Sequence, residues 1–322
     1  MEERKYAVIL GNLGNTKDRF CGAYKENPST EEMLEKASKI PYVKGIELVG
    51  TWDISEDNAC FMAKAFKDLG MECVSIIPDL FANPLYGKGA YTSKDPAIRR
   101  DAIDYTKRMC DVARLMKCKV IDIWPGQDGY DYHFTADYEW ERNWEAEAVT
   151  EIAEAYPDLQ FALEYKPKEP RCHSYMARMG DTLCLSALVN KENVGICIDT
   201  GHGFEGGEII GESIVLAKSM GDKLFHMHFN DNYTSWDDDM MVGSVHSVEY
   251  MEILYWLDRI GYDRWLSMDQ YPYREDAAGA IGESIEWLVK FDKIQRENRD
   301  KITELIRLGN HVETSRFLRG VL

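Results

Sequence analysis

The chain has 322 residues, and 38 Lys and Arg residues against 56 Asp and Glu residues leave a net charge of −18. Apolar residues make up 45% of the sequence, which is enough for a substantial core and excludes wholesale disorder. The negative charge argues against a nucleic-acid or membrane-surface partner, because phosphates and anionic headgroups attract an excess of Lys and Arg. It is compatible with a pocket of carboxylates that holds a divalent cation.

The sequence lacks the features of a secreted or membrane protein. No apolar run approaches the roughly 20 residues that a membrane helix needs. The first ten residues, MEERKYAVIL, carry charges and contain no long apolar segment of a signal peptide. None of the eight cysteines forms a C-x-x-C pair. We therefore expect a soluble, cytoplasmic protein with free thiols.

Short apolar runs alternate with longer amphipathic stretches along the chain. Each run is rich in β-branched or aromatic residues and is followed by turn-forming residues, which is typical of buried parallel strands. The predicted strands are residues 6–12, 43–50, 72–79, 119–126, 159–165, 193–199, 224–231 and 265–272. Helical patterns lie between them, for example over 29–40, 96–116 and 136–156. Ser29 or Thr30 is the expected N-cap of the first helix.

Eight strand–helix units in about 295 residues predict an α/β fold, a single (β/α)₈ or TIM barrel over residues 1–297. The main alternative is a doubly wound open sheet, which favours a G-x-G-x-x-G turn after its first strand. Residues 11–15 (GNLGN) do not match that turn. Residues 298–322 are predicted to form a C-terminal helical extension that packs on the barrel or on a neighbouring subunit.

Polar side chains lie at the ends of the last four predicted strands: Glu164, Asp199, His228 and Asp269. These strands are neighbours, and their carboxyl ends face the mouth of the barrel, so we expect the four side chains to converge. Buried carboxylates are costly without a partner, and a divalent cation provides one. The mixed oxygen and imidazole set suits Mn²⁺, Co²⁺ or Mg²⁺ better than structural zinc.

A second group of polar residues leaves two interpretations open. His202 follows Asp199 by three residues, and Asp237 and Asp239 lie in the loop after the seventh strand. Together with Asp199 they could close a second metal position. A solvated acidic loop explains Asp237 and Asp239 about equally well.

Several of these residues stand in motifs that resemble those of xylose isomerases. Residues 164–171 (EYKPKEPR) resemble the E-x-K-P-x-E-P-R stretch of that family, and residues 199–202 its carboxylate-x-x-His pair. Residues 228–231 (HFND) resemble the H-x-N-D variant of a wider superfamily, which includes sugar epimerases, rhamnose isomerases and endonuclease IV. Asp237 and Asp239 match its D-x-D motif.

The resemblance implies a role for each matching residue. The primary metal ligands would be Glu164, Asp199, His228 and Asp269, and a second site would use His202, Asp237 and Asp239. Lys166 would lie beside the substrate oxygen that the metal holds. The residues expected to bind substrate are Trp124, Gln127, Glu169, Arg171 and His202.

The sequence also departs from xylose isomerases. Residues 49–53 (VGTWD) contain no histidine where that family has its ring-opening residue, and His133 appears instead in an aromatic loop after the fourth strand. With residues 10–24 and 267–276, this loop resembles the catalytic (alpha) subunits of bacterial C-glycoside deglycosidases. That resemblance implies a smaller beta subunit and a homo- or hetero-oligomer.

The specific expectation is a metal-dependent lyase that cleaves the carbon–carbon bond of a 3-oxo-C-glycoside by β-elimination, with His133 or His173 as the base. The alternative is an aldose–ketose isomerase or ketose 3-epimerase. His226 is expected to be structural and to point away from the mouth. An endonuclease IV-like enzyme is disfavoured because no histidine precedes residue 133. A non-catalytic sugar-binding role is disfavoured by the complete ligand set.

Overall fold

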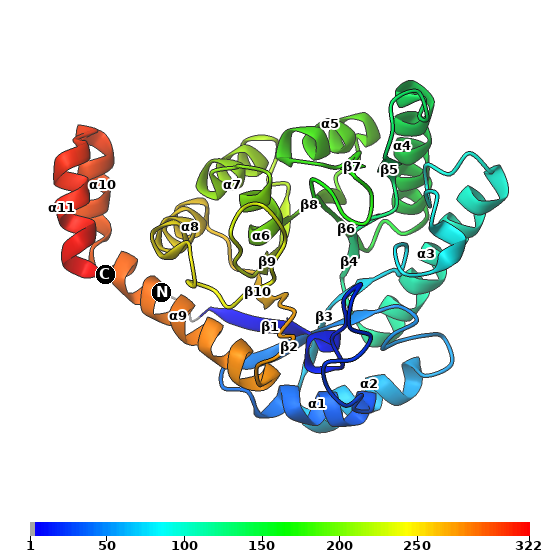
Figure 1. Ribbon diagram of the computed structural model, residues 1–322, viewed down its shortest axis with the longest axis horizontal. Helices are drawn as coiled ribbons and strands as arrows, with labels where there is room; N and C mark the ends of the chain where they lie inside the picture. Colours follow the sequence, from blue (N-terminus) through cyan, green and yellow to red (C-terminus); the bar gives the residue numbers. More distant parts are fainter. Residues whose placement is uncertain (1–3) are drawn as a thin grey trace.

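The computed structural model describes residues 4–322 and shows a closed barrel of eight parallel strands (Figure 1). Going around the barrel, the order is β1-β10-β9-β8-β6-β4-β3-β2. The barrel strands are β1 (Lys5–Ile9), β2 (Val43–Val49), β3 (Glu72–Ile77), β4 (Val120–Ile123), β6 (Gln160–Glu164), β8 (Val194–Asp199), β9 (Leu224–Phe229) and β10 (Trp265–Met268). Each predicted strand coincides with one of these, so the predicted TIM barrel is confirmed.

Helices connect successive strands and cover the outside of the barrel (Figure 1). They are α1 (Thr30–Lys39), α2 (Ala59–Leu69), α3 (Pro96–Met116), α4 (Tyr138–Ala155), α5 (Met179–Val189), α6 (Thr200–Glu205), α7 (Ile210–Ser219), α8 (Ser247–Ile260) and α9 (Ala277–Glu297). Two 3₁₀ turns, η1 (Leu10–Leu13) and η2 (Pro84–Tyr86), follow β1 and β3. Ser29 is the N-cap of α1: its hydroxyl accepts from the Glu32 N–H (3.2 Å), while the Glu32 carboxylate accepts from the Ser29 N–H (2.8 Å).

The alternation of side chains along each strand separates the outer core from the barrel interior. On β8, Ile196 and Ile198 belong to the large apolar core that the helices share, whereas Cys197 packs with an inner group around Phe225. Asp199 lies two residues beyond Cys197 and therefore points inward as well. The same period of two brings polar side chains from several strands into the barrel axis.

Two features lie outside the regular barrel. A two-stranded antiparallel ribbon, β5 (Gly129–Tyr130) and β7 (His173–Ser174), ties together the loops that follow β4 and β6. This ribbon is not among the elements that the sequence pattern predicts.

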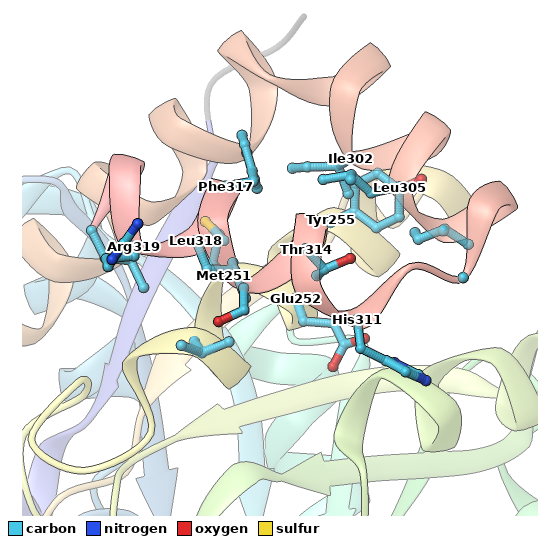
Figure 2. Close-up of a pocket in the computed structure, with 15 residues that line it drawn as sticks. Met251, Glu252, Tyr255, Ile302, Leu305, His311, Thr314, Phe317, Leu318 and Arg319 are labelled. Atoms are coloured by element: carbon cyan, nitrogen blue, oxygen red, sulfur yellow. The ribbon is translucent and has the colours of Figure 1, made fainter.

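The predicted C-terminal helical extension is present as α10 (Arg299–Leu308) and α11 (His311–Val321). These helices stand beside the end of α9, away from the barrel axis (Figure 1). A cavity of about 700 Å³ lies between them and α8, and Figure 2 shows the mainly apolar side chains that line it, among them Met251, Tyr255 and Leu305. Within residues 4–322, no helix combines the length and the hydrophobicity needed to cross a bilayer.

Candidate metal centre

The four predicted ligands converge at the carboxyl end of the barrel. Glu164 ends β6, Asp199 ends β8, His228 is the penultimate residue of β9, and Asp269 follows β10 directly. One ligand atom from each of the four lies within 4.8 Å of those of the other three. His228 Nδ1 is 3.4 Å from Glu164 Oε1 and 3.5 Å from Asp269 Oδ2. The structure thus brings together side chains that are up to 105 positions apart in the chain, from 164 to 269.

Burial makes this cluster electrostatically unfavourable without a cation. Glu164, Asp199 and His228 are buried, and the side chain of Asp269 is 24% exposed. Burial and two neighbouring carboxylates raise the pKa of Asp269 to about 7. Burial also raises the pKa of Asp199. In contrast, His228 and His202 overcome the effect of burial at Glu164 and hold its pKa well below its usual range.

The donor atoms suit a divalent cation. His228 Nδ1 is buried and has no hydrogen-bond partner, although it faces Glu164 and Asp269. Three carboxylates and one imidazole form the mixed oxygen and nitrogen set that Mn²⁺, Co²⁺, Zn²⁺ and related ions accept. A cation at this position would give the free imidazole nitrogen and the crowded carboxylates a common partner.

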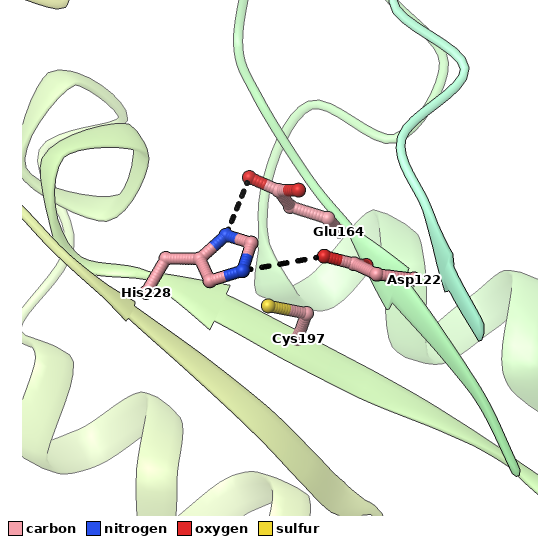
Figure 3. A group of neighbouring side chains, drawn as sticks. All are labelled: Asp122, Glu164, Cys197 and His228. Carbon is pink, nitrogen blue, oxygen red and sulfur yellow. Dashed lines mark ion pairs between the residues drawn. The ribbon is translucent and has the colours of Figure 1, made fainter. Parts of the chain in front are cut away.

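A second layer of carboxylates lies behind His228. Its Nε2 is 3.3 Å from Glu47 Oε2 on β2 and 3.5 Å from Asp122 Oδ2 on β4. Figure 3 shows the ring between Glu164 on one side and Asp122 on the other, with Cys197 beside it. A carboxylate behind a histidine fixes the proton on the far nitrogen, here Nε2, and leaves Nδ1 free to bind a metal.

Sequence reasoning missed Glu47 and Asp122, although a signal was present. Both are acidic residues within short apolar runs, IELV and VIDI, and both are fully buried. Two imidazoles hold the pKa of Glu47 well below its usual range against the effect of burial, and the Ser75 hydroxyl donates to its carboxylate. Asp122 has no hydrogen-bond partner, and burial raises its pKa.

The prediction that the His226 side chain points the opposite way from that of His228 was wrong. Its Nε2 is 2.9 Å from Glu47 Oε1, so it shares a carboxylate with His228 inside the barrel. Residues two apart on a strand lie on the same face, so His226 and His228 point to the same side. His226 lies one layer deeper and is buried.

His202 and Asp237 form a second group next to the metal cluster. His202 Nδ1 is 3.1 Å from Glu164 Oε1, and its Nε2 is 3.1 Å from Asp237 Oδ2. Lys166 Nζ also lies 2.8 Å from Asp237 Oδ2 and 2.9 Å from Glu169 Oε2. Lys166 and His202 already supply positive charge beside Asp237. These contacts do not test the second metal position, which stays a prediction.

Local structure explains the spacing of these motifs. Asp199 is the N-cap of α6, and its Oδ1 accepts from the His202 N–H at 2.8 Å, which is why the carboxylate and the histidine are one helical turn apart. Asn230 donates from Nδ2 to Asp199 Oδ2 at 2.8 Å, and Asp231 accepts from His246 at 2.7 Å. The HFND motif therefore orients a ligand and anchors the following loop.

A cavity of about 470 Å³ opens above the cluster. Its polar lining comprises Asn12, Lys17, Glu164, Lys166, Glu169, His202, Asp237, Asp239 and Asp269. Its aromatic lining comprises Trp52, Phe81, Trp124, Tyr271 and Tyr273.

Two residues expected to bind substrate instead brace loops around this cavity. Gln127 donates to the backbone oxygen of Phe81 at 2.8 Å, and the guanidinium of Arg171 is 3.3 Å from Asp131. Neither is among the residues that line the cavity, whereas Trp124, Glu169 and His202 are.

Both histidines predicted as the base lie outside the cavity lining. His133 is exposed on the loop after β5, between Tyr132 and Phe134, which are also exposed. His173 is held by the β5–β7 ribbon, where its ring stacks on Tyr130 with 4.8 Å between centroids. The ionisable groups that reach the cavity from the loops and ends of the ligand-bearing strands are carboxylates, Lys166, His202 and two tyrosines, Tyr271 and Tyr273.

Comparison with known proteins places this site in a family. A family model described as "Xylose isomerase-like TIM barrel" matches residues 34–291. A xylose isomerase of Thermus thermophilus is 30% identical over 294 residues, which cover 86% of this chain and 75% of the relative.

Solved structures with the same fold include an L-ribulose 3-epimerase (TM-score 0.73, 14% identity, 93% of this chain and 98% of that chain). They also include a 3-keto-D-glucoside 4-epimerase from E. coli (TM-score 0.69, 14% identity, 89% and 99%). These identities show the fold alone, whereas the family match and the Thermus relative extend over most of the sequence. The chain belongs to the xylose isomerase-like TIM barrel family.

Proposed function

We propose that the protein is a divalent-metal-dependent sugar isomerase or epimerase, which moves a proton on a carbon next to a carbonyl group. The observation that carries this proposal is the convergence of Glu164, Asp199, His228 and Asp269 within 4.8 Å. Two of them, Glu164 and Asp269, line the cavity above. The relative named xylose isomerase and the neighbours named 3-epimerase and 4-epimerase support the same class of chemistry.

The four clustered side chains would hold the cation, with Mn²⁺, Co²⁺ or Mg²⁺ as the expected ions. When bound, a dication supplies positive charge that stabilises the oxyanion formed by loss of the proton. Lys166 lines the same cavity, and its contacts with Asp237 and Glu169 hold its pKa well above its usual range against the effect of burial. Lys166 therefore acts as a charged donor toward a sugar oxygen and not as a base.

The proton acceptor must then be a carboxylate of the cavity. Asp237 and Glu169 are engaged by Lys166, and Glu164 is engaged by two histidines. Asp239 also lines the cavity, and burial together with repulsion from Asp237 raises its pKa well above its usual range. We assign proton transfer to Asp239, because among the described carboxylates of the cavity it is neither one of the four clustered side chains nor engaged by Lys166 or a histidine.

The test is hydrogen exchange on a panel of aldoses and ketoses in D₂O, followed by NMR at the carbon next to the carbonyl. Exchange is expected with Mn²⁺, Co²⁺ or Mg²⁺ and is expected to stop in EDTA. A protein that binds the metal in a one-to-one ratio but exchanges no sugar and converts none would contradict the proposal.

A second candidate is the carbon–carbon lyase, which one observation favours. Where xylose isomerases carry a ring-opening histidine, the end of β2 carries Val49 and Trp52. Among residues 4–322, His202 is the one histidine of the cavity lining, and Glu164 and Asp237 engage both of its nitrogens. A substrate that stays cyclic suits such a site.

In that reaction the 3-carbonyl acidifies the C2–H bond of a 3-oxo-C-glycoside. Loss of the C2 proton forms the C1–C2 double bond, and the C1–aryl bond breaks as the aryl carbon takes up a proton. The expected result is release of the aglycone from a 3-oxo-C-glucoside in the presence of Mn²⁺. If no aglycone is released even with a smaller partner subunit present, the lyase proposal fails.

A further inference from the structure

The cavity reaches well beyond the metal cluster. Its volume of about 470 Å³ is within the roughly 300–1,000 Å³ of pockets that take drug-sized ligands. The charged floor comes from the ends of β6, β8, β9 and β10 and the loops that follow them, whereas Trp52, Phe81 and Trp124 come from the loops after β2, β3 and β4 on the other side of the barrel. A sugar ring at the floor therefore faces an aromatic wall across the mouth.

The wall is continuous from the reactive centre outward. Lys166 Nζ is 5.3 Å from the ring centroid of Trp124. The Trp124 ring is 4.5 Å from that of Phe81, and the Phe81 ring is 5.6 Å from that of Trp52. Trp52 is the outermost of the three and is 43% exposed. The Trp52 indole is thus accessible to a ligand at the outer end of the cavity.

A single buried carboxylate fixes this wall in place. Asp79 Oδ2 accepts from Trp52 Nε1 at 3.1 Å and from the Thr51 hydroxyl at 2.6 Å. Its Oδ1 accepts from the N–H of Ala82 at 2.8 Å, next to Phe81. Thr51 has a φ of 64°, a conformation that a β-branched residue rarely adopts and that its surroundings must stabilise. Because the indole is already anchored, a ligand that stacks on it loses little free energy to ordering the side chain.

We propose that Trp52 stacks on a ring attached to the sugar, so that the cavity has a subsite for a glycoside beyond the position of the reacting sugar. This inference rests on the proposed function, in which the metal cluster receives the reacting sugar. The attached ring needs a flat apolar face, which an aromatic aglycone or a second pyranose can present. The experiment distinguishes these two sources.

Binding is measured by calorimetry on the metal-loaded full chain, without any need for turnover. Phenyl β-D-glucoside and cellobiose are each compared with glucose, and phenyl β-D-xyloside is compared with xylose. The attached ring is expected to tighten binding about tenfold. Trp52→Ala should remove most of that gain and leave the affinity for the free sugar within twofold of the original. Trp52→Phe should keep part of the gain.

Trp140→Ala provides the matched control, because Trp140 is an exposed tryptophan on α4 that does not line the cavity. A gain with the phenyl glycosides alone identifies an aromatic aglycone, and a gain with cellobiose alone identifies a second sugar. Equal binding of glycosides and free sugars, no binding of any glycoside, or a gain that survives Trp52→Ala would overturn the subsite. If free sugars exchange hydrogen but the attached ring does not tighten binding, the subsite fails and the proposed function stands. If binding depends on Trp52 but no sugar exchanges hydrogen, the proposed function fails and the subsite stands.

Discussion

Asp269→Asn is expected to stabilise the metal-free protein and at the same time to weaken metal binding. The carboxylate of Asp269 lies in a buried group with those of Glu164 and Asp199. Burial and these neighbours raise its pKa from 3.8 to about 7, and His228 offsets only part of this effect. If these residues had only a structural role, the substitution would change the free energy of unfolding by the same amount with and without metal.

The size and sign of the effect follow from the pKa. The unfolded chain loses the proton of Asp269 near pH 4, whereas the folded chain keeps it to about pH 7. The free energy of unfolding therefore falls as the pH rises through this window and is lowest above it. A pKa shift of about three units corresponds to a loss of at most about 4 kcal/mol in the free energy of unfolding. Because the side chain is 24% exposed, solvent screening lowers the expected gain to about 2 kcal/mol.

Urea unfolding followed by circular dichroism checks this prediction. In EDTA, Asp269→Asn should be more stable than the original chain at pH 8 and equally stable at pH 4. Mn²⁺ at 100 times its Kd should then stabilise the original chain by about 3 kcal/mol and the variant by much less. Asp263→Asn, at an exposed position before β10, is the control. Equal stability of the two proteins at pH 8 in EDTA, or equal stabilisation by Mn²⁺, would refute the reasoning.

Three further predictions concern other carboxylates. Glu47→Gln should lower the Mn²⁺ affinity of the folded protein by about 10- to 100-fold, measured by calorimetry, because a carboxylate no longer fixes the His228 proton on Nε2; unchanged affinity would exclude this role. Asp239→Asn should abolish hydrogen exchange but keep stoichiometric metal binding, and loss of both would instead make Asp239 a ligand. At Glu145, burial and Asp128 raise the pKa to about 8, so stability should fall between pH 4.5 and pH 8. Glu145→Gln should remove that fall, which amounts to at most about 5 kcal/mol, and identical urea midpoints at pH 8 would contradict it.

The sequence by itself determined the barrel and the four clustered side chains. Buried strands and amphipathic helices leave local patterns, because each strand is apolar on both faces and each helix on one. A parallel barrel then places every strand end at the same mouth, so Glu164, Asp199, His228 and Asp269 could be paired without knowing any distance. The three-residue spacing of Asp199 and His202 is equally local, since it reflects one capped helical turn.

Only the tertiary structure decided which side chains meet across the barrel and which loops stay outside it. Glu47 and Asp122 reach His228 because closure of the barrel directs β2 and β4 toward the axis, and no sequence spacing reports that approach. The aromatic loop after β4 suggested His133 as a base, but the β5–β7 ribbon holds His173 at the edge, and His133 is exposed to solvent. Long-range contacts of this kind depend on strand register and loop path, which are set by packing of the whole chain and not by local residue preferences.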